Sequence, residues 1–364
     1  MYDETTTRMI ALYMEEATAP MFLSGFFQSP PANFHTQEKV TVDIERDDED
    51  VAIVVTDLST GARQNESTVY TNKGFTPPIF DEEGTITSYG LLKRQPGQDP
   101  FRDPNYAANA AEEAFRIFRR LERKIRRAVE LMASQVLQSA ALTLTDAAGT
   151  ALYTLDFSGK NSHFPDAGTD WGTVVSEERT DDPLADLGAL ATALRRDGKH
   201  VPNRLVFGSR AFQDFISHPK VMERLDNRNM MVGMVAPVVR GQGATFQGWV
   251  WIGHYRFEMW TYDGFYRDPV SGDHKPYVGD DKVIMLSEGG RLDLTFGAIP
   301  LMRRPEAGPL SFLPPRMSDG DRGLDLTTNA WFTPDGKHLK VSAGTRPLTI
   351  PSGIDTFGCL TTRA

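Results

Sequence analysis

The sequence predicts an α+β protein, because helical and strand patterns are mixed along it without regular βαβ alternation. Three observations support this prediction. Residues 105–142 contain neither proline nor glycine, residues 39–44 alternate polar and apolar side chains, and residues 245–266 form an aromatic-rich β pattern. At ~150 residues per domain, a chain of 364 residues is expected to form two domains, or one large domain with extensions.

The first residues are typical of an extended arm. Pro20, Pro30 and Pro31 interrupt any helix there, and the aromatic residues between them have no long neighbouring segment to cover them. These aromatics are Phe22, Phe26 and Phe27. We expect them to anchor the arm either on the body of this chain or on a neighbouring molecule, and the sequence leaves both possibilities open.

Residues 39–92 are predicted to be mainly β-structure. Short apolar runs at 39–44 and 51–55 flank an acidic stretch, 45–50, that is expected to be a solvated turn. Residues 58–74 are polar, and apolar residues return only near residues 79–80 and 91–92. A lone hairpin is marginally stable in water. We therefore expect this one, with too few apolar residues of its own, to lie on a partner surface.

The strongest local pattern is a helix predicted over residues 103–142, with Asp103 as N-cap and Pro104 at the first helical position. At ~1.5 Å per residue it would be a rod of about 58 Å. Its apolar stripe is predicted to comprise Ala111, Phe115, Phe118, Leu121, Ile125, Ala128, Met132 and Val136. The opposite face is basic, and Glu130 is assigned to it. That face is either solvated, with ion pairs between residues four apart such as Glu122–Arg126, or it contacts an acidic neighbour or nucleic acid.

The remaining chain alternates shorter elements. Strands are predicted at 151–157, 204–207, 282–286, 339–341 and 357–360. Helices are predicted from Pro183 to about Arg196, with Asp182 as N-cap and Gly198 as C-cap, from Ser209 as an N-cap, and from Pro219 to Leu225. The aromatic pattern at 249–265 is most simply a packed sheet, although it could line a site for a sugar or an aromatic ligand.

Composition and motifs disfavour several classes of protein. Lys and Arg number 39 against 49 Asp and Glu, so a net charge of −10 disfavours a surface that grips DNA tightly. One cysteine, Cys359, excludes an internal disulfide framework and a cysteine-based zinc site, and is expected to be a buried apolar residue. No segment resembles a signal peptide or a membrane span of ~18 apolar residues, so no membrane association is expected.

No catalytic motif stands out in the sequence. The seven histidines show no metal-ligand spacing, and no phosphate loop, nucleophile elbow or dinucleotide fingerprint is present. Residues 318–323 are expected to be a turn rather than a calcium loop, because the closing Glu is missing. We expect no enzyme, no cofactor and no metal. The arm, the hairpin and the long helix are instead features that point to assembly.

Several segments, in the same order along the chain, resemble the lambda-type major capsid (major head) proteins of phages. They are residues 26–40, 91–106, 168–171, 182–183, 220–228, 329–336 and 345–348. The resemblance implies the Hong Kong 97-type capsid fold. It implies an N-terminal arm (1–45), an extended loop (46–92), a peripheral domain (93–177) with a spine helix (103–142), an axial domain (178–325) and a C-terminal return to the peripheral domain (326–364).

The resemblance also implies a function. Such proteins form hexamers and pentamers of an icosahedral head, first a procapsid and then an expanded shell, which encloses double-stranded DNA without sequence-specific binding. The protein would assemble in the host cytoplasm and reside in the virion. A portal, a separate scaffolding protein and a decoration protein are implied as partners, and a covalent cross-link through Lys73 is not expected.

Contacts between subunits are expected at residues of the arm, the loop and the helix, namely Phe22, Phe26, Phe27, Arg63, Lys73, Arg119, Arg123 and Arg127. Two alternatives remain at this stage. One is a soluble two-domain enzyme or ligand-binding protein that uses the 249–265 sheet. The other is a cellular nanocompartment shell of the same fold, which would enclose protein cargo.

Overall fold

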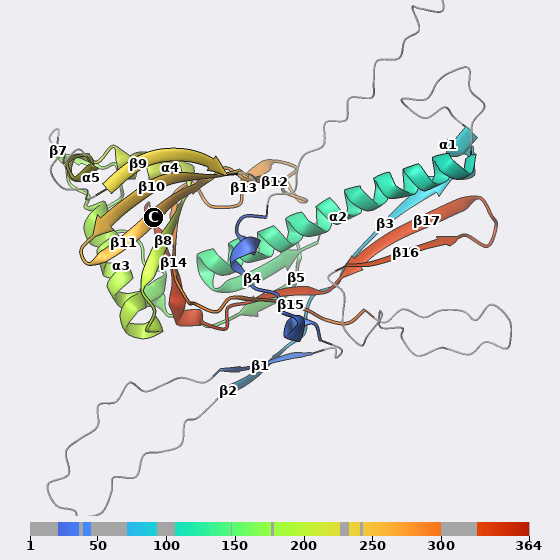
Figure 1. Cartoon of the computed structure of the whole chain (residues 1–364), viewed down its shortest axis with the longest axis horizontal. Helices are drawn as coiled ribbons and strands as arrows, with labels where there is room; N and C mark the ends of the chain where they lie inside the picture. Colours follow the sequence, from blue (N-terminus) through green and yellow to red (C-terminus); the bar gives the residue numbers. More distant parts are fainter. Residues whose placement is uncertain are drawn as a thin grey trace, which may run out of the picture.

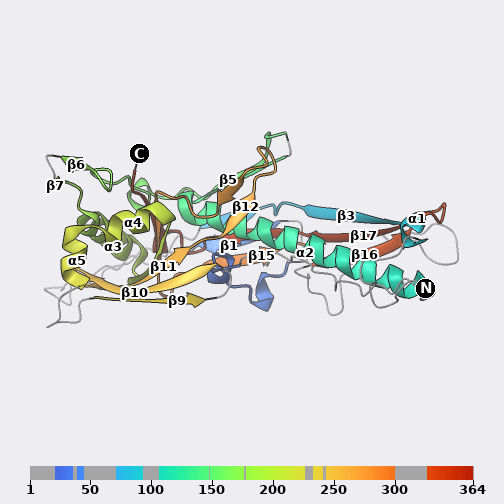
Figure 2. The same ribbon diagram turned by 90° about the horizontal axis from the view of Figure 1, so that it is seen from above.

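The computed structural model describes residues 21–35, 39–44, 71–92, 106–146, 148–175, 178–225, 233–240, 243–299 and 326–363. They form an elongated, flat body with a six-stranded sheet at one end and a three-stranded sheet at the other, joined by a long helix (Figures 1 and 2). Within these ranges no helix is both long and apolar enough to cross a membrane. The mixture of helices and strands is the predicted α+β class.

The six-stranded sheet has the order β19-β14-β8-β11-β10-β9, in which β8 and β11 run parallel and the other neighbours antiparallel. Leu205 and Phe207 face a core with helices α3 and α4, whereas Val206, between them, faces a second core with the long helix. The strands are β8 (Pro202–Phe207), β9 (Gly233–Arg240), β10 (Ala244–Ile252), β11 (Tyr255–Tyr262), β14 (Lys282–Ser287) and β19 (Phe357–Thr361); the helices beside them are α3 (Pro183–Gly198), α4 (Ser209–Ile216) and α5 (Pro219–Leu225).

The ends of these helices partly match the sequence prediction. The Asp182 side chain caps α3 by accepting from the amide of Ala185, and Pro183 is its first residue. The left-handed residue at the C-terminus, however, is Lys199 (φ 62°) and not Gly198. Gly198 is needed for close packing, since a Cβ there would lie 2.2 Å from the carbonyl oxygen of Asp355. The cap of α4 is likewise Gly208 rather than the predicted Ser209.

The long helix, α2, spans Tyr106–Ser139. The predicted extension to residue 142 is wrong, because Ala140 adopts a left-handed conformation (φ 50°) and Leu142 already belongs to a strand. The predicted cap, Asp103-Pro104, lies outside the described residues. A hairpin of β4 (Ala141–Thr145) and β5 (Ala151–Asp156) follows directly.

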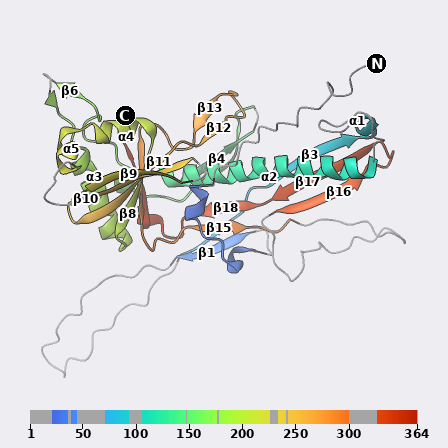
Figure 3. The same cartoon turned by 45° about the horizontal axis from the view of Figure 1, so that its top comes forward.

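The N-terminal half of α2 lies along a three-stranded sheet of order β16-β17-β3 (Figure 3). The helix contacts β17 and β3, and Ile117 approaches Gly84 so closely that a Cβ at Gly84 would lie 2.4 Å from it. The elements are β3 (Phe80–Thr87), α1 (Ser88–Leu92), β16 (Thr327–Phe332) and β17 (His338–Thr345). Residues 80–92, which the sequence assigned to an extended loop, thus lie beside the long helix.

The remaining elements are short pairs at the margins of this body. Strands β1 (Val40–Ile44) and β2 (Thr71–Phe75) pair and extend away from it in Figure 1; the predicted strand at 51–55 and the acidic turn lie outside the described residues. The other pairs are β6 (Val174–Val175) with β7 (Glu178–Arg179), β12 (Phe265–Arg267) with β13 (His274–Pro276), and β15 (Asp293–Phe296) with β18 (Pro347–Ile350). Short 3-10 turns are η2 (Ser24–Phe26), η3 (Pro31–Asn33), η5 (Asn161–His163) and η6 (Ile354–Thr356).

The C-terminal part of the chain divides between the two ends of the molecule. Strands β16 and β17 pair in the three-stranded sheet, as a return to the long helix requires. The last strand does not stay there: β19 pairs with β14 and joins the six-stranded sheet. The continuous apolar run at 357–360 explains this, because both faces of β19 are buried, by α3 on one side and by α2 on the other.

Candidate assembly surfaces

The N-terminal segment, residues 21–35, lies on the body of its own chain. Phe22 packs against Phe26, Trp260 and Tyr262, with ring centroids 5.1–5.4 Å apart. Phe27 is buried in the core shared by α2 and the six-stranded sheet. Of the two possibilities that the sequence left open for these aromatics, the structure therefore shows contact with the same chain. Their role in contacts between subunits stays a prediction.

A buried carboxylate holds this segment in place. Glu130, in the C-terminal half of α2, has 0% of its surface exposed. It accepts hydrogen bonds from the backbone amides of Leu23 (2.7 Å) and Ser24 (2.9 Å), which open the turn η2. It also accepts one from the Tyr262 hydroxyl, at 2.8 Å. Burial, together with the nearby Glu130 carboxylate, raises the pKa of Tyr262.

This finding corrects the prediction for Glu130, which the sequence assigned to the charged outer face of the helix. A single carboxylate joins the arm, the helix and the sheet. Sequence reasoning missed it because its partners are more than 100 positions away. The available signal was its position directly between two apolar residues, Val129 and Leu131.

The second half of the segment is attached at a different place. The side-chain amide of Asn33 donates to the Asp293 carboxylate at 3.1 Å, and the Phe34 ring stacks on Phe296 at 5.0 Å. The amide of Gln28 donates to the Leu292 carbonyl at 2.8 Å. Residues 28–35 therefore follow strand β15 toward β1.

The basic face of α2 is partly neutralised within the chain. Arg126 pairs with Glu122 at 2.9 Å, as predicted, and Arg116 pairs with Glu113 at 2.9 Å. Lys124 reaches Glu82 on β3 at 3.0 Å. The solvated and internally paired interpretation therefore holds for three basic residues of this face, which are Arg116, Lys124 and Arg126.

The three arginines predicted as contacts between subunits lie on this same helix. Arg119 is exposed, whereas Arg123 and Arg127 are half-buried. The predicted stripe is confirmed at Leu121, Ile125, Met132 and Val136, which are buried, whereas Phe118 and Ala128 are half-buried. The prediction is wrong for Ala111 and Phe115, which are exposed, Phe115 by 67%. Of the two loop residues, Lys73 lies in β2 opposite Val42, and Arg63 falls outside the described residues.

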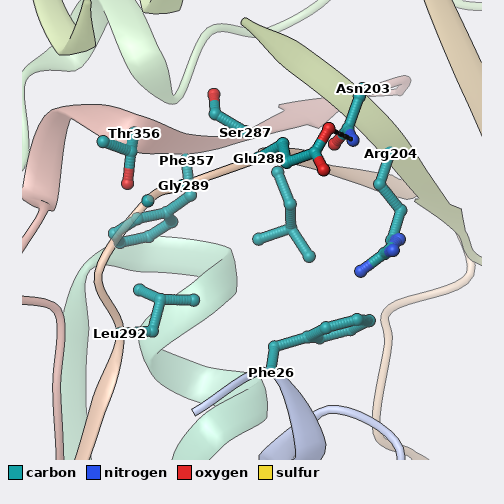
Figure 4. A pocket seen from close by; sticks show the side chains of 11 residues that line it. Phe26, Asn203, Arg204, Ser287, Glu288, Gly289, Leu292, Thr356 and Phe357 are labelled. Carbon is teal, nitrogen blue, oxygen red and sulfur yellow. Dashed lines mark hydrogen bonds between the residues drawn. The ribbon is translucent and has the colours of Figure 1, made fainter. Parts of the chain in front are cut away.

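Two cavities border the N-terminal segment. The first, of about 190 Å³, lies between Phe26 and the turn after β14, and the Arg204 guanidinium stands 5.2 Å from the Phe26 ring centre (Figure 4). Across it, the Asn203 amide donates to Glu288 at 3.0 Å. The second, of about 320 Å³, lies between the segment and α2.

Titratable groups elsewhere are explained by packing. Cys359 is buried on β19, and burial raises the pKa of its thiol to about 12, so it is not a reactive nucleophile. His163 is fully buried; its Nε2 lies 3.1 Å from the Asp197 carboxylate, and burial lowers its pKa despite that contact. Within the described ranges, no group of three His, Cys, Asp or Glu side chains could hold a metal ion.

Large apolar side chains are exposed at the far end of the molecule from the six-stranded sheet. Phe332, at the end of β16, is 73% exposed, and Trp331 beside it is 37% exposed. The sequence assigned no role to either residue. Strict alternation of polar and apolar residues would have predicted which face of this strand is exposed. The segment 327–332 has polar residues on both faces, so its pattern makes no such prediction.

The arrangement of a long helix and two sheets is similar to that of several solved structures. A crystal structure assigned to the capsid protein of a prophage of E. coli CFT073 superposes with a TM-score of 0.57, at 16% identity, over 82% of this chain and 80% of that one. The capsid of Ralstonia phage GP4 aligns with a TM-score of 0.48 at 9% identity, over 98% of this chain and 91% of that one. A third similar structure is the SrpI encapsulin of Synechococcus elongatus PCC 7942, with a TM-score of 0.44 at 10% identity, over 96% and 92%.

Residues 7–358 match the model of the family described as phage major capsid protein E. The chain belongs to this family, and it is a capsid protein whose copies form the shell of the virion. No curated protein sequence matches the chain. The prophage structure supports the Hong Kong 97-type fold, and the predicted resemblance is confirmed.

Proposed function

We propose that this protein forms hexamers and pentamers that close into an icosahedral head around double-stranded DNA. The family match over residues 7–358 carries the proposal. An elongated, flat subunit also suits a thin wall, because such a subunit presents long edges to its neighbours (Figure 2). Its net charge of −10 disfavours adhesion of packaged DNA to that wall.

The proposed domains follow the order of the chain. Residues 1–45 are the arm, 46–92 the extended loop, 93–177 the peripheral domain, 178–325 the axial domain and 326–364 the return segment. Two strand pairings favour small changes to these proposed boundaries. Strand β3 pairs with β17 beside α2, which supports a loop that ends before Phe80. Strand β19 pairs with β14, which supports placing it in the proposed axial domain.

The proposal includes partners and a place of assembly. A portal, a scaffolding protein and a decoration protein would act with this chain, and heads would form in the host cytoplasm before DNA enters. The protein would work as a structural subunit without catalysing a reaction. The buried thiol of Cys359 and the buried position of His163 are in keeping with this role.

Electron microscopy of the purified protein, and of heads produced with its neighbouring genes, tests the proposal. We expect closed shells built from hexamers and pentamers, which contain DNA when packaging proteins are present. A small stable oligomer under all conditions would refute the shell. Shells that enclose only protein cargo would refute the DNA container and favour a nanocompartment.

A further inference from the structure

Strand β16 is the outer strand of the three-stranded sheet, and within the described part of the chain no strand pairs with its free edge. Five of its six residues are exposed. Natural edge strands are usually protected by lysine, proline or a bulge. The sequence of β16, Thr-Thr-Asn-Ala-Trp-Phe, contains neither lysine nor proline and carries two exposed aromatic residues.

The opposite edge of the same sheet is different. Strand β3 contains three consecutive acidic residues at 81–83. Two of them already form ion pairs, Glu82 with Lys124 and Glu83 with Lys340. A second copy of β3 placed beside it would bring like charges together, which is unfavourable. Strand β16 has no charged residue, so a second β16 meets no such repulsion.

The pairing of β16 with β17 shows on which side of the sheet each β16 side chain lies. Phe332, Ala330 and Thr328 pair with Leu339, Val341 and Ala343 of β17, respectively. The last two β17 residues are fully buried in the core beneath α2. Because paired residues lie on the same face of a sheet, Thr328, Ala330 and Phe332 are on the face that carries α2. The helix contacts β17 and β3, and these three β16 residues are exposed.

We propose that β16 pairs antiparallel with β16 of a second copy across a two-fold axis, which makes one six-stranded sheet from two subunits. This inference rests on the shell function proposed above. Pairing centred on Ala330 places Thr328 opposite Phe332 and Asn329 opposite Trp331, so each aromatic meets a smaller side chain. A two-fold axis perpendicular to the sheet keeps both long helices on the same side of it. Unpaired backbone groups provide the attraction, and the aromatic contacts add to it.

A cysteine at the centre of the pairing tests the geometry. In Ala330→Cys the two new thiols would face each other at ~4.5–5.5 Å between Cβ atoms, close enough for oxidation or a short thiol cross-linker to join them. The native Cys359 is buried, so the background is low. The matched control is Thr85→Cys, which is exposed on the other edge strand. We expect covalent dimers from assembled Ala330→Cys particles and none from the control.

A charge-swap experiment tests the energetics. Ala330→Lys and Ala330→Glu should each lower the particle yield by about tenfold or more, because like charges would face each other at the axis. A mixture of the two should restore particles, which a folding defect would not do. Circular dichroism tests whether each variant is folded. If a charged variant is not folded, the cross-linking of Ala330→Cys alone decides whether β16 pairs with β16 of a second copy.

Two outcomes would overturn the inference while the shell function stands. One is particles of Ala330→Cys without covalent dimers. The other is wild-type particle yields from either charged variant alone. If the unmodified chain forms no particles under any condition, the shell function itself fails instead.

Discussion

The Tyr262 hydroxyl donates a hydrogen bond of 2.8 Å to the buried carboxylate of Glu130, which links strand β11 to the C-terminal half of the long helix. The same carboxylate accepts two backbone amides of the N-terminal segment. Three donors satisfy this carboxylate although it is buried. Without it, each donor would be left unpaired, at a cost in the free energy of folding. The Glu130 side chain therefore fixes the start of the described arm, at Leu23 and Ser24.

Glu130→Gln tests this link. The amide group of glutamine would present a donor to the amide of Ser24 or Leu23, so we expect the free energy of unfolding to fall by about 1–3 kcal/mol. Urea denaturation measures this change, and limited proteolysis should show faster cleavage at residues 21–28. The control is Glu122→Gln, which breaks a half-exposed ion pair on the same helix and should cost less than ~1 kcal/mol. Equal effects of the two variants would show that the buried carboxylate has no special role.

Gly198→Ala tests the packing of α3 against η6. A Cβ at this position would lie 2.2 Å from the Asp355 carbonyl oxygen, so backbone must move. We expect a loss of about 1–3 kcal/mol in the free energy of unfolding. Gly25→Ala is the matched control, because a Cβ there has no neighbour within 4 Å. A neutral Gly198→Ala would mean that the end of α3 is free to shift.

The buried His163 predicts a specific pH dependence. Burial lowers its pKa in the folded protein, so below about pH 6.5 the unfolded chain binds a proton that the folded chain does not. The free energy of unfolding should therefore fall as the pH decreases from about 6.5 toward the lowered pKa, by at most ~1.4 kcal/mol per pH unit. Denaturation at several pH values measures the slope. His163→Gln should reduce this slope, and His274→Gln, at an exposed position, should leave it unchanged; the reverse pattern would assign the effect to another group.

Reversal of charge on the long helix tests its role in assembly. We hypothesise that acidic segments of neighbouring subunits contact the basic face of the long helix, beside the pairs that this face already forms with Glu113, Glu122 and Glu82. Replacement of Arg119, Arg123 and Arg127 by glutamate should then abolish head formation, as judged by sedimentation and electron microscopy. Replacement of the same three residues by lysine keeps the charge and should preserve assembly. Normal heads from the glutamate variant would refute this hypothesis.

Local sequence patterns predicted the elements well where neighbouring residues decide the structure. The long helix follows from the absence of glycine and proline between Pro104 and residue 142 and from its apolar stripe, which is buried at Leu121, Ile125, Met132 and Val136. Asp182 and Pro183 start α3 as predicted, since the cap and its acceptor lie within three residues. The aromatic meander folded as a packed sheet, with Phe257 and Met259 buried on one face.

Errors occur where a distant contact overrides the local pattern. Phe115 fits the helical stripe but is exposed, because the side of α2 that packs on the three-stranded sheet is formed by Ala114, Ile117 and Leu121. Gly198 was predicted as a C-cap, yet the close approach of Asp355, more than 150 positions away, explains the glycine. The helix ended three residues early because Leu142 found a strand partner, Leu155, across the β4–β5 hairpin.

The sequence by itself determined the class of fold, the dominant helix and the likeness to phage shell proteins, since these depend on periodicity and on the order of short segments. Only the tertiary structure decided that the arm lies on its own chain, that Glu130 is buried beneath it, that β19 crosses to the six-stranded sheet and that β16 keeps a free edge. Each of these depends on pairs of residues far apart in the chain, and no local pattern specifies which distant donor or strand will meet them.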